Sequence, residues 1–411
     1  MAEVRRLMLV LQTTTVGGME SHCVDLAAEF ARRSVRLQAV IPTAQVFDPL
    51  ADRFRNAGAD VRRMDTDGRN GRLTQVGQLF RLGIQMREFG PEVVHLQTGG
   101  ATGGTAVVAL ARLAGAIAVV TEHDVPVERP ARLARASRFW LDRWAHVLIA
   151  VSRRNAALRV ARIRPSLERF AVVLNGVPIP EIETEARSTN RASVRNDYRV
   201  GPDRIVVGSV VRLADGKGLP ELIRAFAIVN GTIGRSELIL VGDGPLRAEL
   251  EALVDSLGIT DVVHFAGNQR QPGRFLDAFD IFVLAVPEGS MSIALLEAMA
   301  RGVPSLITFC GPEEAIRPDE TGVCGPPNDP AGLAAALAPI VEDANLRERL
   351  GHAAAAHVRR HYSVSRVADD ILDLYASGRG GVLPAGLRAD AAVDPRPGDR
   401  DPARSTSASG A

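Results

Sequence analysis

The sequence predicts an α/β protein built from two doubly wound parallel sheets in tandem. Short apolar runs alternate with helical patterns along most of the 411 residues, which is the arrangement of strand–helix–strand units. The runs are apolar throughout, as is typical of strands covered on both faces. One polar, proline-bearing stretch at 178–203 interrupts the pattern and therefore indicates a division into two domains.

The first half carries a loop with paired glycines, Gly17 and Gly18, between its first strand and first helix. Such a turn lets an anion approach the backbone N–H groups of the helix start. The pattern G-x-G-x-x-G is incomplete, so support for a dinucleotide is weak. The expected strands are 6–12, 35–41, 61–64, 92–97, 117–121, 146–151 and 171–174, and the expected helices include 19–32, 73–89, 103–113 and 129–144.

The second half repeats this order, beginning with a strand at 205–211 and a helix opened by Pro220, a position where proline loses no hydrogen bond. Further strands are expected at 237–241, 262–265, the start of 280–304, and 305–309. An alanine-rich helix is expected at 331–362. The predicted organisation is an N-terminal domain (1–180), a linker (181–203), a C-terminal domain (204–362), a last helix (363–377) that packs back on the first domain, and a disordered tail (378–411).

Composition favours a cytoplasmic protein. No apolar run approaches the ~18–20 residues of a membrane span, and the N-terminal run is too short for a signal peptide. Three cysteines, Cys23, Cys310 and Cys324, show neither metal-ligand spacing nor a disulfide framework, as expected in a reducing compartment.

Charge is unevenly distributed, although the formal net charge is only +1. Residues 1–180 hold 25 arginines against 16 acidic residues, which suggests an anionic partner or a membrane surface, or simply a solvated basic surface. Lys217 is the only lysine among 49 basic residues. Its retention indicates a site that needs a compact point charge.

In open α/β sheets, ligands bind beyond the carboxyl ends of the strands. The loops that follow the expected strands should therefore open on one inter-domain cleft. Within 280–304, Glu297 lies on an otherwise apolar helix, where burying a carboxylate is costly without a partner. It either holds a ligand or forms a surface pair with Arg301, worth only ~0.2–0.5 kcal/mol. The loops are 13–18, 97–103, 122–126, 212–219, 242–244, 267–271 and 286–292.

From about residue 6 to about 376 the chain resembles the family-four retaining glycosyltransferases, whose GT-B fold has two doubly wound Rossmann-like domains facing a central cleft. The resemblance rests on many motifs in one order, among them TTTVGGMESHCVDLA, VVTEHDVP, VGSVVRLADGKGLPELIRAF and PEGSMSIALLEAMARGVPSLIT. It implies a metal-independent transferase of hexosyl type, with an acceptor-side first domain and a second domain that binds a nucleotide diphosphate sugar. No further cofactor and no nucleic acid are expected, and the acceptor would be lipid-linked or a cell-envelope polysaccharide precursor.

The resemblance implies catalytic roles for four residues. Arg212 and Lys217 would stabilise the charge that grows on the nucleotide diphosphate as the glycosidic bond breaks. His123 would line the sugar-binding centre and donate a hydrogen bond to the sugar or acceptor. Glu288 would contact the hydroxyls of the donor sugar.

The implied donor site includes a ribose contact at Glu297 and phosphate contacts at the paired glycines. No metal ligand is expected in it. The donor-binding positions are Gly17, Gly18, Arg212, Lys217, Asn268, Gly289, Ser290, Met291, Ser292 and Glu297.

The spacing of the two glutamates departs from the family. Eight residues separate Glu288 from Glu297, whereas the family has seven, so counting back from Glu297 reaches Gly289. Either the loop bulges by one residue and presents Glu288, or backbone groups of residues 289–292 replace it. A second departure is Gln97, where the family often has histidine; His95, two residues earlier, is predicted to be structural.

Other interpretations remain open. An Asp-x-Asp triplet at 65–67 has the form of a metal site of the other glycosyltransferase fold, but single triplets are common. A nucleotide-sugar 2-epimerase shares the architecture, and a non-catalytic binding relative is a third alternative. The helix 129–144 is basic and carries Trp140 and Trp144, so it either contacts an anionic membrane from the cytoplasmic side or packs its aromatic side chains inward.

Overall fold

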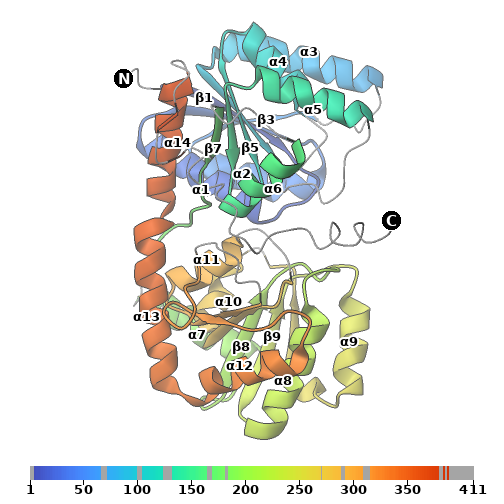
Figure 1. Ribbon diagram of the computed structural model, residues 1–411, viewed down its shortest axis with the longest axis vertical. Helices are drawn as coiled ribbons and strands as arrows, with labels where there is room; N and C mark the ends of the chain where they lie inside the picture. Colours follow the sequence, from blue (N-terminus) through green and yellow to red (C-terminus); the bar gives the residue numbers. More distant parts are fainter. Residues whose placement is uncertain are drawn as a thin grey trace, which may run out of the picture.

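The computed structural model contains two parallel sheets stacked end to end (Figure 1). The strand order is β3-β2-β1-β4-β5-β6-β7 in the first sheet and β10-β9-β8-β11-β12-β13 in the second. Each order reverses beside its first strand, as a doubly wound sheet requires. The structure describes residues 4–65, 72–99, 104–123, 132–163, 169–180, 184–269, 271–287, 292–308 and 315–378, with 383, 384 and 387.

The N-terminal domain has helices on both faces of its sheet. Alternate residues of β1 enter two separate cores, one shared with α1, α2 and α14 and the other with α3, α4 and α5, because successive strand side chains point to opposite faces. Its elements are β1 (Arg6–Gln12), α1 (Gly18–Arg32), β2 (Arg36–Ile41), α2 (Asp48–Asn56), β3 (Asp60–Arg63), α3 (Arg72–Phe89), β4 (Val93–Thr98), α4 (Thr105–Leu113), β5 (Ile117–Glu122), α5 (Arg132–Trp144), β6 (Val147–Ala150), α6 (Arg153–Ile163) and β7 (Phe170–Val172), with a short 3-10 turn at Gln45–Phe47.

The C-terminal domain repeats this plan with α8, α9 and α12 over one face and α7, α10, α11 and α13 over the other. Its elements are α7 (Glu185–Asp197), β8 (Ile205–Val210), α8 (Leu219–Ile233), β9 (Ser236–Val241), α9 (Arg247–Ser256), a 3-10 turn (Thr260–Val262), β10 (Val263–Gly267), α10 (Gly273–Ala278), β11 (Ile281–Leu284), α11 (Ile293–Ala300), β12 (Ser305–Ile307), β13 (Val323–Cys324), α12 (Pro330–Glu342), α13 (Ala344–His361) and α14 (Val364–Gly378).

The chain crosses between the domains at two adjacent points. Val177 donates a backbone hydrogen bond to Tyr362 (2.8 Å), and Val364 donates one back to Val177 (2.9 Å). Beyond this crossing α14 packs against α1, where Tyr375 enters the same core as Phe30. Figure 1 shows α13 and α14 running along one side of the molecule from the second domain to the first.

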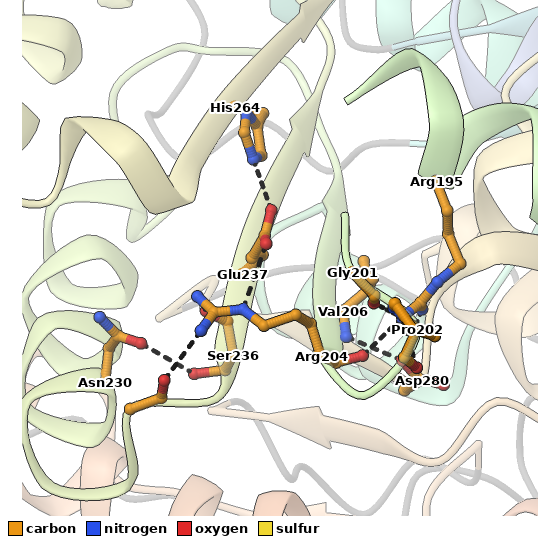
Figure 2. Close-up of polar contacts among 11 residues, drawn as sticks. Arg195, Gly201, Pro202, Arg204, Val206, Asn230, Ser236, Glu237, His264 and Asp280 are labelled. Carbon is orange, nitrogen blue, oxygen red and sulfur yellow. Dashed lines mark hydrogen bonds and ion pairs between the residues drawn. The ribbon is translucent and has the colours of Figure 1, made fainter. Parts of the chain in front are cut away.

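The segment expected to be a linker contains helix α7, which docks on the second domain. Arg195 of α7 pairs with Asp280 (3.3 Å) and donates to the carbonyl oxygens of Gly201 (2.8 Å) and Arg204 (2.6 Å). Figure 2 shows these contacts, with the Asp280 carboxylate also accepting from Val206 N–H. The polar composition that suggested a linker is that of an amphipathic helix held by ion pairs.

Two sequence expectations need correction. The helix expected at 331–362 is two helices, α12 and α13, because Asp343 caps the second with hydrogen bonds from the N–H groups of Asn345 and Leu346. The absence of disulfides was wrong for Cys324, which is disulfide-bonded to a partner outside the described residues. Strand pairing between β12 and β13 brings Cys324 beside Ile307, a proximity that sequence spacing does not reveal.

Two glycines provide a test of the packing in the second sheet. A Cβ at Gly208 on β8 would lie 2.2 Å from the Phe279 ring, whereas a Cβ at Gly231 on α8 would meet nothing within 4 Å. Gly208→Ala should lower the free energy of unfolding by about 1–3 kcal/mol through overpacking. Gly231→Ala, the matched control, should raise it by about 0.5–1 kcal/mol. Urea denaturation followed by circular dichroism measures both, and equal effects would contradict the packing described.

Candidate active site

The candidate site lies where α1 of the first domain meets α11 of the second. A Cβ at Gly18, the first residue of α1, would lie 3.2 Å from Cγ1 of Ile293, the first residue of α11. Each helix follows the carboxyl end of a strand, β1 or β11, so the carboxyl edges of the two sheets face each other (Figure 1). Gly17, Gly18 and Ser292, predicted as one donor site, are therefore brought together from opposite domains.

Both helix starts are capped from within their own helices. The N–H of Gly17 donates to the carboxylate of Glu20 (2.7 Å), and the hydroxyl of Ser292 accepts from the N–H of Leu295 (3.3 Å). Gly17 and Gly18 are exposed. The backbone at the start of α1 is thus accessible to a ligand, in a region where helix dipoles favour negative charge.

The loop after β8 carries Arg212 and Lys217, and its path is set by glycine. Gly218 has φ +63°, and a Cβ there would lie 1.8 Å from the carbonyl oxygen of Ala285 at the end of β11. No other residue fits this position. Arg212 is exposed and Lys217 is half-buried. The fold consequently places the only lysine beside the strand that leads to α11.

His123 follows β5 and sits among buried polar side chains. Its Nε2 lies 2.8 Å from Oε1 of Gln97, and its carbonyl oxygen accepts from Asn155 (3.0 Å). The ring of His22 from α1 meets it edge-on at 6.5 Å. Burial, then His22 and His95, lower the pKa of His123 to about 3. His123 is therefore neutral near pH 7.

Glu297 does not form the side-chain pair with Arg301 that its spacing allows. Arg301 donates from Nη1 to the backbone oxygen of Glu297 (3.0 Å) and from Nε to Asp277 (3.2 Å). Burial raises the pKa of Glu297, while Arg301 and Arg53 oppose the shift. The half-buried carboxylate of Glu297 forms no ion pair with any side chain in the described part of the chain.

Asp25 of α1 faces this carboxylate from the other domain. Burial raises the pKa of Asp25 to about 7, and the negative charge of Glu297 adds to the shift. Arg53 of α2 lowers the pKa of both groups. The domain contact thus brings together two carboxylates that share the influence of Arg53, and a hydroxyl-rich or cationic ligand group would relieve their repulsion.

A buried ion-pair cluster supports the end of β5. Arg159 of α6 is 1% exposed and pairs with Glu122, the residue before His123, and with Asp142 of α5 (2.5 Å). Breaking a buried pair leaves an uncompensated charge, so this cluster ties α5 and α6 to the strand that positions His123. Arg159 was not identified from the sequence because arginine is abundant throughout the first half.

Several positions predicted from the sequence are not seen at the α1–α11 contact. Asn268 is exposed after β10. Of the Asp-x-Asp triplet, Asp65 accepts hydrogen bonds from Thr43 (2.9 and 2.5 Å), and the other two residues lie outside the described chain. The remaining predicted positions outside the described residues are Glu288, Gly289, Ser290 and Met291.

A cavity of about 650 Å³ lies at the opposite end of α11 and takes no part in the candidate site. Its lining includes Arg187 and Arg301, which both pair with Asp277 (3.0 and 3.2 Å), and Arg191, which pairs with Asp280 (2.6 Å). These pairs hold α7 in place. Within the described ranges, no group of three or more His, Cys, Asp or Glu residues is arranged to hold a metal ion.

Family models match both domains of this chain. The model "Glycosyltransferase Family 4" covers residues 16–180, and "Glycosyl transferases group 1" covers residues 190–357. The chain belongs to the family-four glycosyltransferases. The predicted family and its two-domain GT-B fold are therefore confirmed.

Curated relatives of this glycosyltransferase family match part of the chain. The lipopolysaccharide core biosynthesis glycosyltransferase LpsD of Rhizobium meliloti (strain 1021) is 34% identical over 185 residues, or 45% of this chain and 53% of LpsD. The alpha-D-kanosaminyltransferase of Streptomyces kanamyceticus is 28% identical over 58% of this chain and 62% of its own length. The chain thus spans about half to three-fifths of the length of these relatives.

Solved structures share the fold over nearly the whole chain. The Anabaena Alr3699/HepE structure in complex with UDP and glucose has a TM-score of 0.77 and 20% identity, covering 90% of this chain and 99% of HepE. WaaG, described as a glycosyltransferase involved in lipopolysaccharide biosynthesis, has a TM-score of 0.65 and 17% identity over 90% of this chain and 99% of its own. At these identities the likeness concerns the fold.

The raised pKa of Asp25 predicts a pH-dependent stability. Its ordinary value is 3.8 and its folded value about 7, so the folded state binds the proton more tightly and stability falls as pH rises from about 4 to about 7. Asp25→Asn should raise the free energy of unfolding by the order of 1 kcal/mol at pH 8 and change it little at pH 4.

Urea titrations at both pH values test this expectation. Asp52→Asn, at an exposed position of α2, is the control and should show no comparable difference between the two pH values. If Asp25→Asn changed the free energy of unfolding equally at pH 4 and pH 8, the raised pKa of Asp25 would be contradicted.

Proposed function

We propose that the protein is a retaining glycosyltransferase that moves a sugar from a UDP-linked donor. The observation that carries this proposal is the contact between the starts of α1 and α11, with the Lys217 loop packed at the end of the strand that leads to α11, in a chain matched by glycosyltransferase models on both domains. UDP is proposed because HepE structures contain UDP or UDP-glucose. The curated relatives carry transferase names, which favours a transferase over an epimerase or a non-catalytic binder.

Lys217 and Arg212 are proposed to stabilise the leaving nucleotide diphosphate. Negative charge on this group increases as the bond to the anomeric carbon lengthens, so fixed cations stabilise the transition state more than the ground state. The N–H groups at the start of α1 would add to this stabilisation. We propose that these groups do the work without a metal ion, on a hexosyl donor.

Glu297 is proposed to bind the donor ribose. Its carboxylate accepts no ion pair from Arg301, and ribose hydroxyls are donors of the kind that would satisfy it. They would also lower the pKa of Glu297, because hydrogen bonds to a carboxylate favour its ionised form. Glu288 or the backbone of residues 289–292 remains the proposed contact of the donor sugar.

The acceptor is proposed to be a cell-envelope polysaccharide or its lipid-linked precursor. LpsD and LpsE are described as lipopolysaccharide core biosynthesis glycosyltransferases, and EpsF as a putative glycosyltransferase. Such acceptors are assembled at membranes, so an enzyme that uses one needs a surface that reaches the membrane. No helix within the described residues is long and apolar enough to cross a membrane.

The layer of α3, α4 and α5 presents exposed apolar side chains at the end of the first domain remote from the second (Figure 1). Phe80 is 69% exposed, Leu113 84% and Trp140 47%. Val76 and Ile84 are also exposed and extend the Phe80 stripe along α3. Single exposed apolar residues are ordinary on surfaces, whereas several large ones on three adjacent helices favour an interaction site.

Charge identifies an anionic membrane as the proposed occupant of this surface. Arg81, Arg87, Arg112 and Arg143 are exposed on the same three helices, against the single exposed acidic residue Glu88. Basic residues beside aromatic side chains bind anionic headgroups and insert into the interface. The sequence predicted a membrane contact for residues 129–144 alone, and the proposed surface also includes α3 and α4.

Turnover tests the enzymatic proposal. Wild-type protein should release UDP from a UDP-sugar, and Lys217→Ala should lower that rate by about 10²–10³-fold, the usual effect of removing one group that stabilises developing charge. Lys217→Arg should retain part of the rate. Arg224→Ala, an exposed position on α8, is the control and should be unchanged.

A thermal-shift panel of UDP, ADP and GDP accompanies the assay, since a bound nucleotide raises the melting temperature. UDP should give the largest shift. Stabilisation by UDP without turnover of any UDP-sugar would mean that the protein binds nucleotides and is not a transferase.

Liposome cosedimentation tests the membrane surface. The protein should bind vesicles rich in phosphatidylglycerol at low salt and release them as salt screens the charges. Phe80→Glu combined with Trp140→Glu should lower binding by at least tenfold. Ile228→Glu, at a 49% exposed position on α8 of the other domain, is the control, and equal losses for both variants would contradict the assignment.

A further inference from the structure

A chain of buried side chains connects His123 to the C-terminal helix. Nε2 of His123 contacts Oε1 of Gln97 (2.8 Å), Nε2 of Gln97 contacts Nε2 of His95 (3.1 Å), and Nδ1 of His95 contacts the hydroxyl of Tyr375 (2.6 Å). Thr121 adds a contact to Nε2 of His95 (2.7 Å). Tyr375 and His95 are at most 1% exposed, and His123 is 8% exposed.

The Gln97 amide determines the proton position on His123. An amide oxygen only accepts, so His123 must carry its proton on Nε2. The amide nitrogen of Gln97 lies 3.1 Å from Nε2 and 3.4 Å from Nδ1 of His95, and this contact keeps the amide oxygen turned toward His123. A charged form of either ring is disfavoured, because burial lowers the pKa of His95 and of His123 to about 3.

We propose that Tyr375, His95 and Gln97 act as positioning residues that hold His123 in the Nε2–H tautomer and leave its Nδ1 as a hydrogen-bond acceptor. Among the described residues no side chain donates to that nitrogen. Under the proposed function, on which this inference rests, His123 would accept a hydrogen bond from a hydroxyl of the sugar or acceptor. It would not donate one, which reverses the role expected from the sequence.

The series of hydrogen bonds from His123 to Tyr375 also gives α14 a functional role. This helix belongs in sequence to the second domain, yet Tyr375 lies in the core of the first and closes the series of hydrogen bonds that begins at the site. The polar series is specific: replacing any member by an apolar residue leaves a buried donor or acceptor unsatisfied, which is costly. Packing alone would be served equally well by phenylalanine at 375.

Nitrogen-15 NMR of histidine-labelled full-length protein at pH 7 tests the tautomers without reference to activity. The two-bond correlations should report Nε2–H for His123, with its assignment from His123→Gln. In Tyr375→Phe the His123 signals should shift toward a mixture of tautomers. An Nδ1–H proton on His123 in the wild type would overturn the inference, whatever the protein catalyses.

Enzyme kinetics provide a second test of the inference. Tyr375→Phe and Gln97→Leu should each lower kcat about tenfold while leaving the affinity for UDP within about twofold, because neither residue is among the proposed UDP-binding groups. The double variant should be no worse than Gln97→Leu alone, since Tyr375 acts through Gln97. Additive losses, or a loss that appears only as a lower melting temperature, would mean a structural role.

Tyr198→Phe is the matched control. Tyr198 packs against the tilted rings of His264 and Phe275 in the second domain, away from this series of side chains, and its variant should leave kcat and the His123 tautomer unchanged. If the wild type shows no turnover, the proposed function fails and the NMR result still decides the tautomers. If turnover is normal in Tyr375→Phe and the tautomers are unchanged, the inference fails and the proposed function stands.

Discussion

The contact between the first residues of α1 and α11 is the constraint on which the rest of the site depends. Gly18 has no side chain, so Ile293 of the other domain approaches to within van der Waals distance of where one would be. Two helix starts, each the positive end of a helix dipole, are thereby brought together. A bulkier residue at Gly18 would separate the domains and divide the site.

The same contact concentrates charge. Asp25 and Glu297 approach from opposite domains, Arg53 of α2 acts on both, and burial raises the pKa of both carboxyls. Burying two carboxylates in this way is costly for stability, and perturbed groups of this kind cluster at binding sites. A ligand that donates hydrogen bonds to Glu297 would recover part of that cost, so binding and domain contact are expected to support each other.

The two domains are joined a second time where the C-terminal part of the chain returns to the first domain. The crossing at Val177 and Tyr362 carries α14 across α1, and Tyr375 then reaches the buried histidines behind His123. The residues at the end of β5 are thus held by two groups of buried contacts. One is the hydrogen-bonded series from Tyr375 to His123, and the other is the Arg159 ion-pair cluster. Both supports are buried, where hydrogen bonds and ion pairs fix orientation strongly, and both act on the residues at the end of β5.

The sequence by itself determined the two sheets, nearly all of their strands and the family, because buried parallel strands and glycine loops leave local patterns. It also singled out Gly18, Lys217 and Glu297, whose roles as donor contacts stay predictions. It did not reveal the roles of Gln97, Asp25, Arg159 or Tyr375, or the failure of Glu297 to pair with Arg301. Those depend on contacts between distant segments: Asp277 competes successfully for Arg301, and only the folded chain brings α14 to β4. Local periodicity records which face of an element is buried, whereas the partner that it meets is decided by tertiary packing.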